Sequence, residues 1–192
     1  MKHRVLVTAF SILLLVILII EIGNIVKILF PLNYAELISK YSRKYNLNPY
    51  LISAVIKTES NYNPRAQSAK NAFGLMQITP ATAEWAAKEM KLNNYKNENL
   101  LDPEYNINMG CWYLDNLKKE FNDNMDLVLA AYNGGRGNVE KWLADSEHSN
   151  DGVNLHYIPF KETDKYIKRV KVNYNIYKFL YKNTFTIAPI IN

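Results

Sequence analysis

The residue best suited to chemistry in this chain is Glu59, a carboxylate that ends the apolar run LISAVIK. If this run is a helix, Glu59 lies on the same face as Val55 and Ile56, which mark the buried side. It also lies near the helix carboxyl end, where the macrodipole disfavours negative charge. Both effects raise the pKa of a carboxyl group and suit it to general acid catalysis. An exposed glutamate paired with Lys57 or Arg65 is the alternative.

The segment after Glu59, SNYNPRAQSAKNAFGLMQ, is expected to leave the helix and return before the next one. Pro64 disfavours helix at the residue before it, and Asn71 and Gly74 tolerate positive φ angles. Each polar side chain here is ordinary for a turn, but beside a buried acid the set indicates a sugar site. The amide and hydroxyl residues are Ser60, Asn61, Asn63, Gln67, Ser68 and Gln77.

Helical patterns account for nearly all of the remaining sequence, so we expect an all-α domain. Cap-and-proline pairs begin helices at Asn48, Thr79 and Asp102, and Asn33 is a further candidate cap. No segment alternates with period two for long. The expected helices are 33–45, 48–59, 79–90, 102–121, 126–133, 137–145 and 162–183, with a surface loop at 146–160.

The amino end differs from the rest of the chain. Lys2, His3 and Arg4 precede an uncharged run of about 16 residues, slightly short of a full span. Apolar character resumes after Glu21 and continues to Phe30. A cleaved secretory signal has a similar start, but no small-residue cleavage site follows, so an uncleaved anchor is favoured. We expect a single-pass anchor at 1–30, with the domain at 31–192 on the extracytoplasmic side; cleavage would instead give a secreted form.

Composition excludes several other classes. The single cysteine, Cys111, cannot form an internal disulfide, and the histidines lack metal-ligand spacing, so neither metal nor cofactor is expected. No arginine-rich run indicates nucleic acid. The net charge of +5 suits anionic lipid or wall polymer, but a solvated helix face is the favoured explanation of the carboxyl-terminal cations. These are Lys161, Lys165, Lys168, Arg169, Lys171, Lys178 and Lys182.

The stretch ESNYNPRAQSAKNAFGLMQITPATA resembles the signature of the soluble-lytic-transglycosylase catalytic domain, a lysozyme-like family. Three later motifs resemble the same family in the same order: NINMGCWYLDNL, AAYNGG and IPFKETDKYIKRV. The resemblance extends from about Tyr34 to Tyr177. The chain departs from the family at Asn71 for Gly, at Gly134 for Ala, and at Thr79 for an apolar residue, so no role is assigned to Thr79.

The resemblance implies a lysozyme-like fold and a peptidoglycan substrate. By that resemblance, Glu59 protonates the glycosidic oxygen after N-acetylmuramic acid while the acetamido group stabilises the sugar cation. The carboxylate then takes a proton from the muramic C6 hydroxyl, which attacks C1 and leaves a 1,6-anhydro end. Such substrate-assisted chemistry explains how one acid suffices.

The resemblance also assigns roles to residues around the acid. Ser68 and Gln77 would hydrogen-bond the sugar, and Tyr166 would position the acid or the acetamido group. Tyr132 and Asn133 would line the cleft, although core packing is the simpler role for either tyrosine. Glu162 would support the site by bonding backbone or Tyr groups.

Two alternatives stay open at this point. A hydrolytic muramidase of the same fold would need a second carboxylate to hold water, for which Glu84, Asp102 and Glu162 are candidates. A non-catalytic peptidoglycan-binding protein would have no need of Glu59. The sequence indicates neither the cutting pattern, nor the oligomeric state, nor the biological process.

Overall fold

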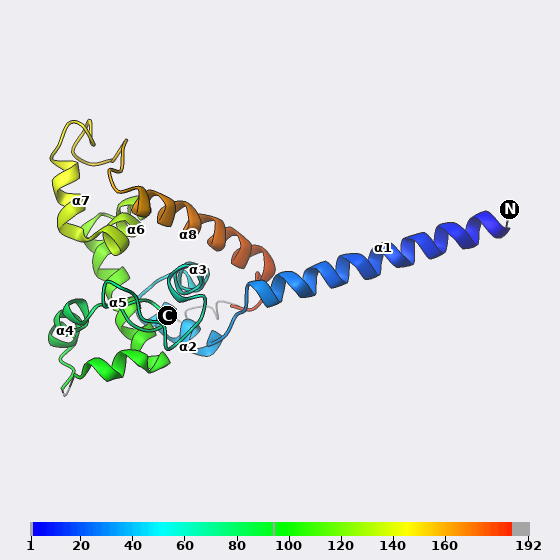
Figure 1. Ribbon diagram of the computed structural model, residues 1–192, viewed down its shortest axis with the longest axis horizontal. Coiled ribbons are helices and arrows are strands. Elements are labelled where there is room, and N and C mark those ends of the chain that lie inside the picture. Colours follow the sequence, from blue (N-terminus) through cyan, green and yellow to red (C-terminus); the bar gives the residue numbers. More distant parts are fainter. Residues whose placement is uncertain (1, 94, 186–192) are drawn as a thin grey trace, which may run out of the picture. The chain divides into compact units, whose positions relative to one another are not determined.

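The computed structural model of the protein describes residues 2–93 and 95–185, apart from the side chains of residues 2 and 5. Contacts divide the chain into two units, Met1–Asn33 and Tyr34–Asn192, close to the predicted boundary at residue 30. The first unit contains α1 (Lys2–Leu29), the blue helix of Figure 1. Its stretch Leu6–Leu29 is long and apolar enough to cross a membrane, and none of it is buried. A secretory signal shares these features, so the choice between anchor and signal stays a prediction.

The second unit is built from helices, which confirms the predicted all-α class. Outside the helices, the described residues form two isolated β-bridges, Gln67–Phe73 and Phe73–Ile78. The helices are α2 (Ala35–Lys44), α3 (Pro49–Ser60), α4 (Pro80–Glu89), the short 3₁₀ helix η1 (Asn97–Leu101), α5 (Pro103–Glu120), α6 (Met125–Gly134), α7 (Arg136–Leu143) and α8 (Lys161–Leu180).

The predicted cap-and-proline starts are present at three helices. The side chains of Asn48, Thr79 and Asp102 accept backbone N–H bonds at the starts of α3, α4 and α5, each followed by proline. The prediction for Asn33 is wrong. The chain enters α2 through Tyr34 at φ 60°, with no side-chain cap, so Asn33 lies one residue outside the cap position.

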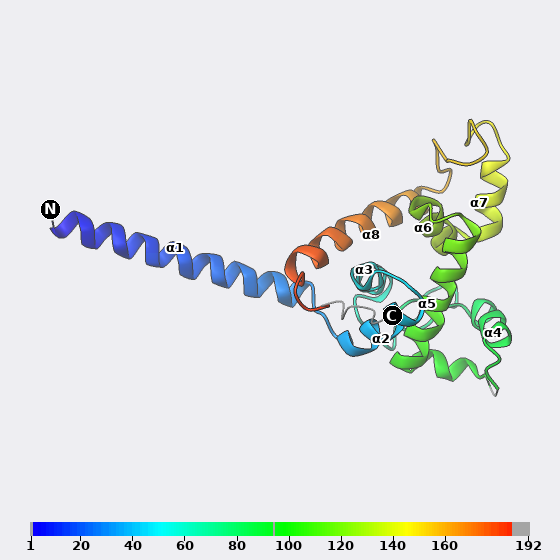
Figure 2. The same ribbon diagram turned by 180° about the vertical axis from the view of Figure 1, so that it is seen from behind.

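The centre of the domain is the contact between α3 and α8. Both views show these helices side by side, with α4 on the far side of α5 (Figures 1 and 2). The middle of α3 is fully buried, including Ile52, Val55 and Ile56. Asn173 of α8 donates to the Thr58 hydroxyl at 2.9 Å, so a polar bond joins the two helices beside Glu59. The buried face predicted for α3 is therefore confirmed.

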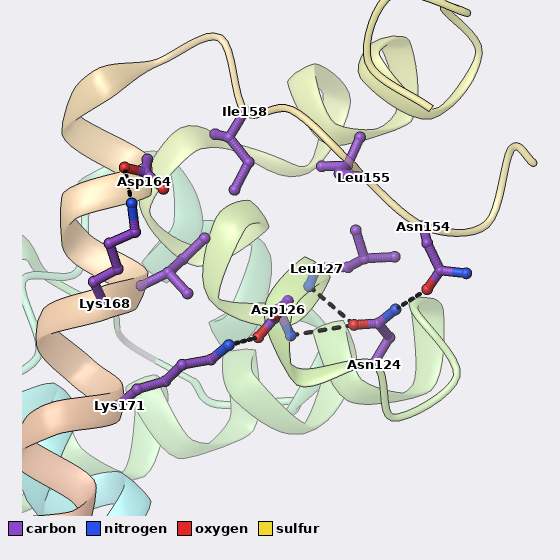
Figure 3. Close-up of a pocket in the computed structure, with 10 residues that line it drawn as sticks. Asn124, Asp126, Leu127, Asn154, Leu155, Ile158, Asp164, Lys168 and Lys171 are labelled. Atoms are coloured by element: carbon purple, nitrogen blue, oxygen red, sulfur yellow. Dashed lines mark hydrogen bonds and ion pairs between the residues drawn. The ribbon is translucent and has the colours of Figure 1, made fainter. Parts of the chain in front are cut away.

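One ion pair between α6 and α8 and one within α8 border a polar pocket of about 210 Å³. Lys171 Nζ lies 2.6 Å from Asp126, and Lys168 Nζ lies 2.7 Å from Asp164 (Figure 3). Asn124 caps α6 and donates to Asn154 of the loop after α7. None of the predicted site residues lines this pocket, so it is separate from the site considered below.

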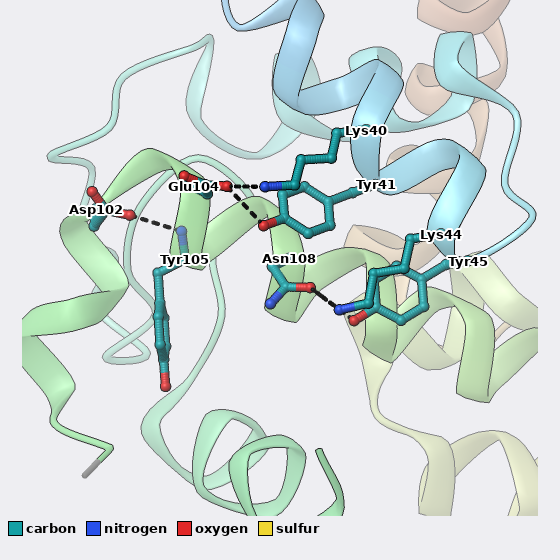
Figure 4. Close-up of polar contacts among 8 residues, drawn as sticks. All are labelled: Lys40, Tyr41, Lys44, Tyr45, Asp102, Glu104, Tyr105 and Asn108. Carbon is teal, nitrogen blue, oxygen red and sulfur yellow. Dashed lines mark hydrogen bonds and ion pairs between the residues drawn. The ribbon is translucent and has the colours of Figure 1, made fainter. Parts of the chain in front are cut away.

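Polar contacts also hold α2 against α5. Glu104 accepts hydrogen bonds from Lys40 at 2.6 Å and from the Tyr41 hydroxyl at 3.0 Å (Figure 4). One turn further along, the Tyr45 hydroxyl donates to Asn108 at 2.8 Å. Solvent screens exposed pairs of this kind, so they fix the register of α2 more than they stabilise the fold.

Candidate active site

Glu59 lies in the last turn of α3, which ends because Asn61 takes a left-handed conformation at φ 52°. The position is the one predicted, on the buried face and near the carboxyl end of the helix. Among the described residues, the alternative pairing with Lys57 or Arg65 is not found: Lys57 instead donates to the Asn61 side chain.

The predicted rise in the pKa of Glu59 is present, at about 7 against an ordinary 4.5. Burial is the largest cause. The Tyr166 hydroxyl opposes it as a hydrogen-bond donor, the charge of Glu162 raises the pKa further, and Lys70 lowers it. Protein atoms surround the carboxyl group closely, yet the residue keeps part of its surface exposed. Glu59 can therefore hold a proton near neutral pH and still be reached from outside.

Two tyrosines from other helices flank Glu59. Their own burial, and then the negative charge of Glu59, raise the pKa values of Tyr132 on α6 and Tyr166 on α8 well above the usual range. Both therefore stay neutral hydrogen-bond donors. The Tyr166 hydroxyl makes no hydrogen bond of ordinary geometry within the described part of the chain, but it lies near enough to Glu59 to act as a loose donor.

The loop after α3 returns to the end of that helix, as predicted. Asn71 and Gly74 have the expected positive φ angles of 58° and 75°, and Gln77 adds a third at 50°. The Ser60 hydroxyl, on the turn that holds Glu59, donates to the Leu75 carbonyl at 2.8 Å. This hydrogen bond ties the returning part of the loop to the end of the helix that carries Glu59.

A fully buried side chain, Asn106 of α5, anchors the returning part of the loop. Its Oδ1 accepts the Met76 N–H at 2.7 Å, and its Nδ2 donates to the carbonyls of Phe73 and Leu100 at 2.9 and 2.8 Å. Tyr132 completes the anchoring, because its hydroxyl donates to the Met76 carbonyl at 2.8 Å. A buried amide with its partners satisfied fixes a single arrangement.

Two glycines allow this close approach. A Cβ on Gly74 would collide with the Leu100 carbonyl and the Asn106 amide, and its φ of 75° also favours glycine. A Cβ on Gly110 of α5 would collide with the Met76 side chain. The glycines therefore let the loop GLMQ lie directly on α5.

Ser68 and Gln77, predicted to bind sugar, also shape the loop. The Ser68 hydroxyl oxygen accepts the Ala72 N–H at 3.1 Å, and Gln77 Nε2 donates to the carbonyls of Ala66 and Gly74 at 3.2 and 3.0 Å. These bonds leave the Ser68 hydroxyl proton and the Gln77 Oε1 for a ligand. Their role in sugar binding stays a prediction.

The two predicted residues at the α6–α8 junction have different surroundings. Asn133 accepts a hydrogen bond from the Thr163 hydroxyl at 2.9 Å, which ties α6 to the start of α8. Glu162 was expected to bond backbone or Tyr groups. It is exposed instead and forms an ion pair with Lys70 at 2.8 Å, which connects the loop to α8. Glu162 acts on the site through its negative charge, which raises the pKa of Glu59.

The candidates for a second acid do not share one location. Glu162 is the carboxylate whose charge acts on Glu59. Asp102 caps α5 by accepting the Tyr105 N–H at 2.8 Å, and Glu84 is exposed on α4. Of the three, Glu162 is the one placed to affect the chemistry of Glu59.

Sequence reasoning missed Asn106 and Lys70. A signal for Asn106 existed, because it is a polar residue on the same helical face as Gly110, Tyr113 and Leu117. Lys70 had no such signal, because its partner is distant in the sequence. Sequence reasoning also missed a group of possible metal ligands, Asp145, Glu147 and His148, whose ligand atoms lie within 4.8 Å. Asp145 accepts the Glu147 N–H there, which is ordinary turn geometry and needs no ion.

Residues 36–154 match the family model of the transglycosylase SLT domain. The chain belongs to this family. The matched range contains Glu59 and the loop after it but ends before Glu162 and Tyr166. The resemblance seen in the sequence is confirmed.

Among named SLT relatives, the soluble lytic murein transglycosylase of Salmonella typhimurium is 39% identical over 143 residues, which cover 73% of this chain and 22% of that protein. Membrane-bound lytic murein transglycosylase C of Pectobacterium atrosepticum is 36% identical over 129 residues, covering 62% of this chain and 36% of that protein. The chain thus spans about a quarter of the length of the first curated relatives it matches.

Solved structures of SLT relatives share the fold. The 70 kDa soluble lytic transglycosylase of Escherichia coli superposes with a TM-score of 0.70 at 34% identity, over 78% of this chain and 25% of that one. An inactive Glu-to-Gln mutant of lytic transglycosylase Slt from Pseudomonas aeruginosa gives 0.71 at 29% identity, over 81% of this chain and 25% of that one. The expected lysozyme-like helical fold is confirmed.

Proposed function

We propose that this protein is a membrane-anchored peptidoglycan lytic transglycosylase in which Glu59 is the general acid and then the general base. The supporting observation is the ionisation of Glu59: a carboxyl group with a pKa of about 7, closely surrounded by protein and flanked by two neutral tyrosines. A group with this pKa gives and takes a proton with similar ease near neutral pH, as a two-step role requires.

In the first step, Glu59 donates its proton to the glycosidic oxygen between N-acetylmuramic acid and N-acetylglucosamine. The C1–O bond breaks, and the substrate's acetamido oxygen stabilises the positive charge at C1. Glu59 is now a carboxylate, and the Tyr166 hydroxyl, which lowers its pKa, donates toward the new charge. The loose geometry of that donor in the neutral state leaves room for it to tighten as charge develops.

In the second step, the Glu59 carboxylate removes the proton of the muramic C6 hydroxyl. The C6 oxygen forms a bond to C1, which closes the 1,6-anhydro ring and returns Glu59 to its acid form. No water is consumed. The loop supplies polar groups for the sugar, with Gln77 Oε1 and the Ser68 hydroxyl as the available hydrogen-bonding atoms.

Anchoring is supported by the amino-terminal helix and by relatives. Leu6–Leu29 has the length and composition of a span, and several similar proteins are named membrane-bound lytic murein transglycosylases. The basic residues before the span favour an amino end on the inside, which supports a Glu59 site on the wall side. Here the substrate is the glycan strand of peptidoglycan, which carries its own acetamido group.

A hydrolytic muramidase is the second candidate, and Glu162 is the observation that favours it. Glu162 is a second carboxylate whose charge reaches Glu59. It is exposed, however, and Lys70 occupies its Oε2 at 2.8 Å, so this oxygen is engaged by a lysine rather than by a water beside the acid. We therefore rank transglycosylation above hydrolysis.

Product analysis separates these candidates. The detergent-solubilised full chain is incubated with purified peptidoglycan, and the soluble fragments are analysed by mass spectrometry. Anhydro-muramic ends, one water lighter than reducing ends, are expected. Reducing muramic ends without anhydro ends would refute the transglycosylase proposal.

Three variants assign the residues. Glu59→Gln is expected to lower turnover by about 100-fold or more, whereas Glu162→Gln should leave the anhydro product unchanged. Glu98→Gln, an exposed acid on η1, is the matched control. Equal binding without turnover in wild type and Glu59→Gln would instead support a binding protein.

A further inference from the structure

The outer face of α8 carries apolar side chains that the domain does not bury. Val172 is 57% exposed and Phe179 is 80% exposed. They are seven residues apart, so they lie on the same side of the helix, and the half-buried Ile176 lies between them. The opposite side of α8 packs into the core through Tyr166, Val170 and others.

The same face becomes cationic toward the start of α8. Lys165 and Arg169 lie seven and three residues before Val172, on its side of the helix, and both are exposed. The ion pairs described on α8 instead use Lys168 and Lys171, both seen in Figure 3, and Glu162. Lys165 and Arg169 therefore take part in no described ion pair, and their charges are available to an outside partner.

A single exposed apolar residue would need no explanation. Two at helical spacing, continued by unpaired cations on one face, have the composition of a helix that lies on a membrane surface. A second copy of the chain fits poorly. Paired in parallel, the Lys165 and Arg169 sides would meet like charge, and paired antiparallel they would meet residues 172–183, which contain no carboxylate. A glycan strand fits poorly too, because it offers no apolar phase for Phe179.

We propose that this face docks on an anionic bilayer. Val172, Ile176 and Phe179 enter the headgroup boundary, and Lys165 and Arg169 contact lipid phosphates. The proposal rests on the proposed anchoring by α1. Weak binding of the α8 face to lipid is enough for docking when α1 is anchored, because residues 30–34 alone connect α1 to α2. Such a linker spans at most about 20 Å and keeps the local lipid concentration high.

Docking would also limit which glycan strands are cut. Tyr166, beside the acid, lies on the buried side of α8, whereas Lys165, the residue before it, is exposed on the docking face. With that face on the bilayer, the width of α8, about 10 Å, separates the Glu59 site from the lipid and keeps it close to the surface. Cleavage is then directed to strands next to the membrane rather than to the outer wall.

The test uses the full chain in phosphatidylcholine vesicles with and without phosphatidylglycerol. A spin label is attached at Phe179→Cys, since the native Cys111 is fully buried, and a matched label at Ser146→Cys reports an exposed loop. With anionic lipid, the label at 179 should gain access to dissolved oxygen and lose access to a water-soluble nickel chelate. The label at 146 should stay accessible to nickel in both.

Charge variants complete the test. Lys165→Gln with Arg169→Gln should weaken docking about 25-fold, about fivefold for each cation near an anionic surface. Lys88→Gln with Lys141→Gln, which removes exposed cations from other helices, should leave it unchanged. Equal nickel access at 179 and 146 in anionic vesicles would overturn the proposal. It would also be overturned if protection at 179 depended on the number of protein copies per vesicle and not on the fraction of anionic lipid. Flotation of the chain with vesicles tests the α1 anchor separately.

Discussion

Replacing Glu59 by Gln should make the protein more stable at alkaline pH and not at acidic pH. Glutamine has nearly the same shape but never ionises. The pKa of Glu59 is raised from 4.5 to about 7 in the folded chain, so the folded state binds this proton more tightly than the unfolded state. The stability that this provides is complete below about pH 4.5 and is lost as pH rises through about 7.

The size of the effect follows from the pKa difference. A shift from 4.5 to about 7 corresponds to about 3 kcal/mol between the two ends of that pH range. Because Glu59 keeps part of its surface exposed, solvent screening reduces this to about 2 kcal/mol. The gap in unfolding free energy between Glu59→Gln and wild type should therefore widen by about 2 kcal/mol from about pH 4 to about pH 8.

Urea denaturation of the full chain in detergent micelles measures this gap, with tryptophan fluorescence as the signal. The three tryptophans, Trp85, Trp112 and Trp142, all lie in the Tyr34–Asn192 unit, so α1 does not contribute. Glu98→Gln on the surface should show no such pH dependence. A gap between Glu59→Gln and wild type that stays constant with pH would show that Glu59 has an ordinary pKa, and the reasoning for a general acid would fail.

Three further predictions concern the site and its supports. Activity should fall above about pH 7 as Glu59 loses its proton, and Tyr166→Phe should move that alkaline limb upward, because the Tyr166 hydroxyl lowers the pKa of Glu59; a downward shift in the pH–rate profile would contradict this. Asn106→Leu removes the side-chain partner of the buried Met76 N–H and Leu100 carbonyl, whereas the Phe73 carbonyl keeps the Ile78 N–H. The change should cost about 2 kcal/mol or more in urea denaturation; a loss below about 1 kcal/mol would count against the anchoring role. Gly110→Ala should destabilise by about 1–3 kcal/mol through its collision with the loop. Gly137→Ala on α7, with nothing near its Cβ, should instead stabilise by up to about 1 kcal/mol in the same assay.

The sequence by itself determined the features that depend on near neighbours. Caps at Asn48, Thr79 and Asp102 act within one helical turn, so their residue types predict them correctly. The face that carries Glu59 follows from the period of the helix, and the rise in its pKa follows from that face and from the helix end. Family motifs in the right order added the fold and the expected chemistry.

The error at Asn33 shows the limit of local signals. The sequence offers Asn33 as an ordinary cap, but the chain enters α2 through a left-handed Tyr34. The residue types in this turn therefore do not by themselves give the backbone angles at the start of α2. Propensity is a weak prior where packing acts on the same residues.

Only the tertiary structure decided which residues from distant segments meet. Three contacts join positions 30 or more residues apart: Asn106 with the Met76 N–H, Tyr132 with the Met76 carbonyl, and Lys70 with Glu162. Glu162 was expected to bond backbone or Tyr groups but lies exposed in an ion pair with Lys70. This partner too comes from a distant segment. Helical spacing states which face a residue occupies, whereas its partner depends on how whole helices pack, and that packing is decided by the shapes of many side chains together.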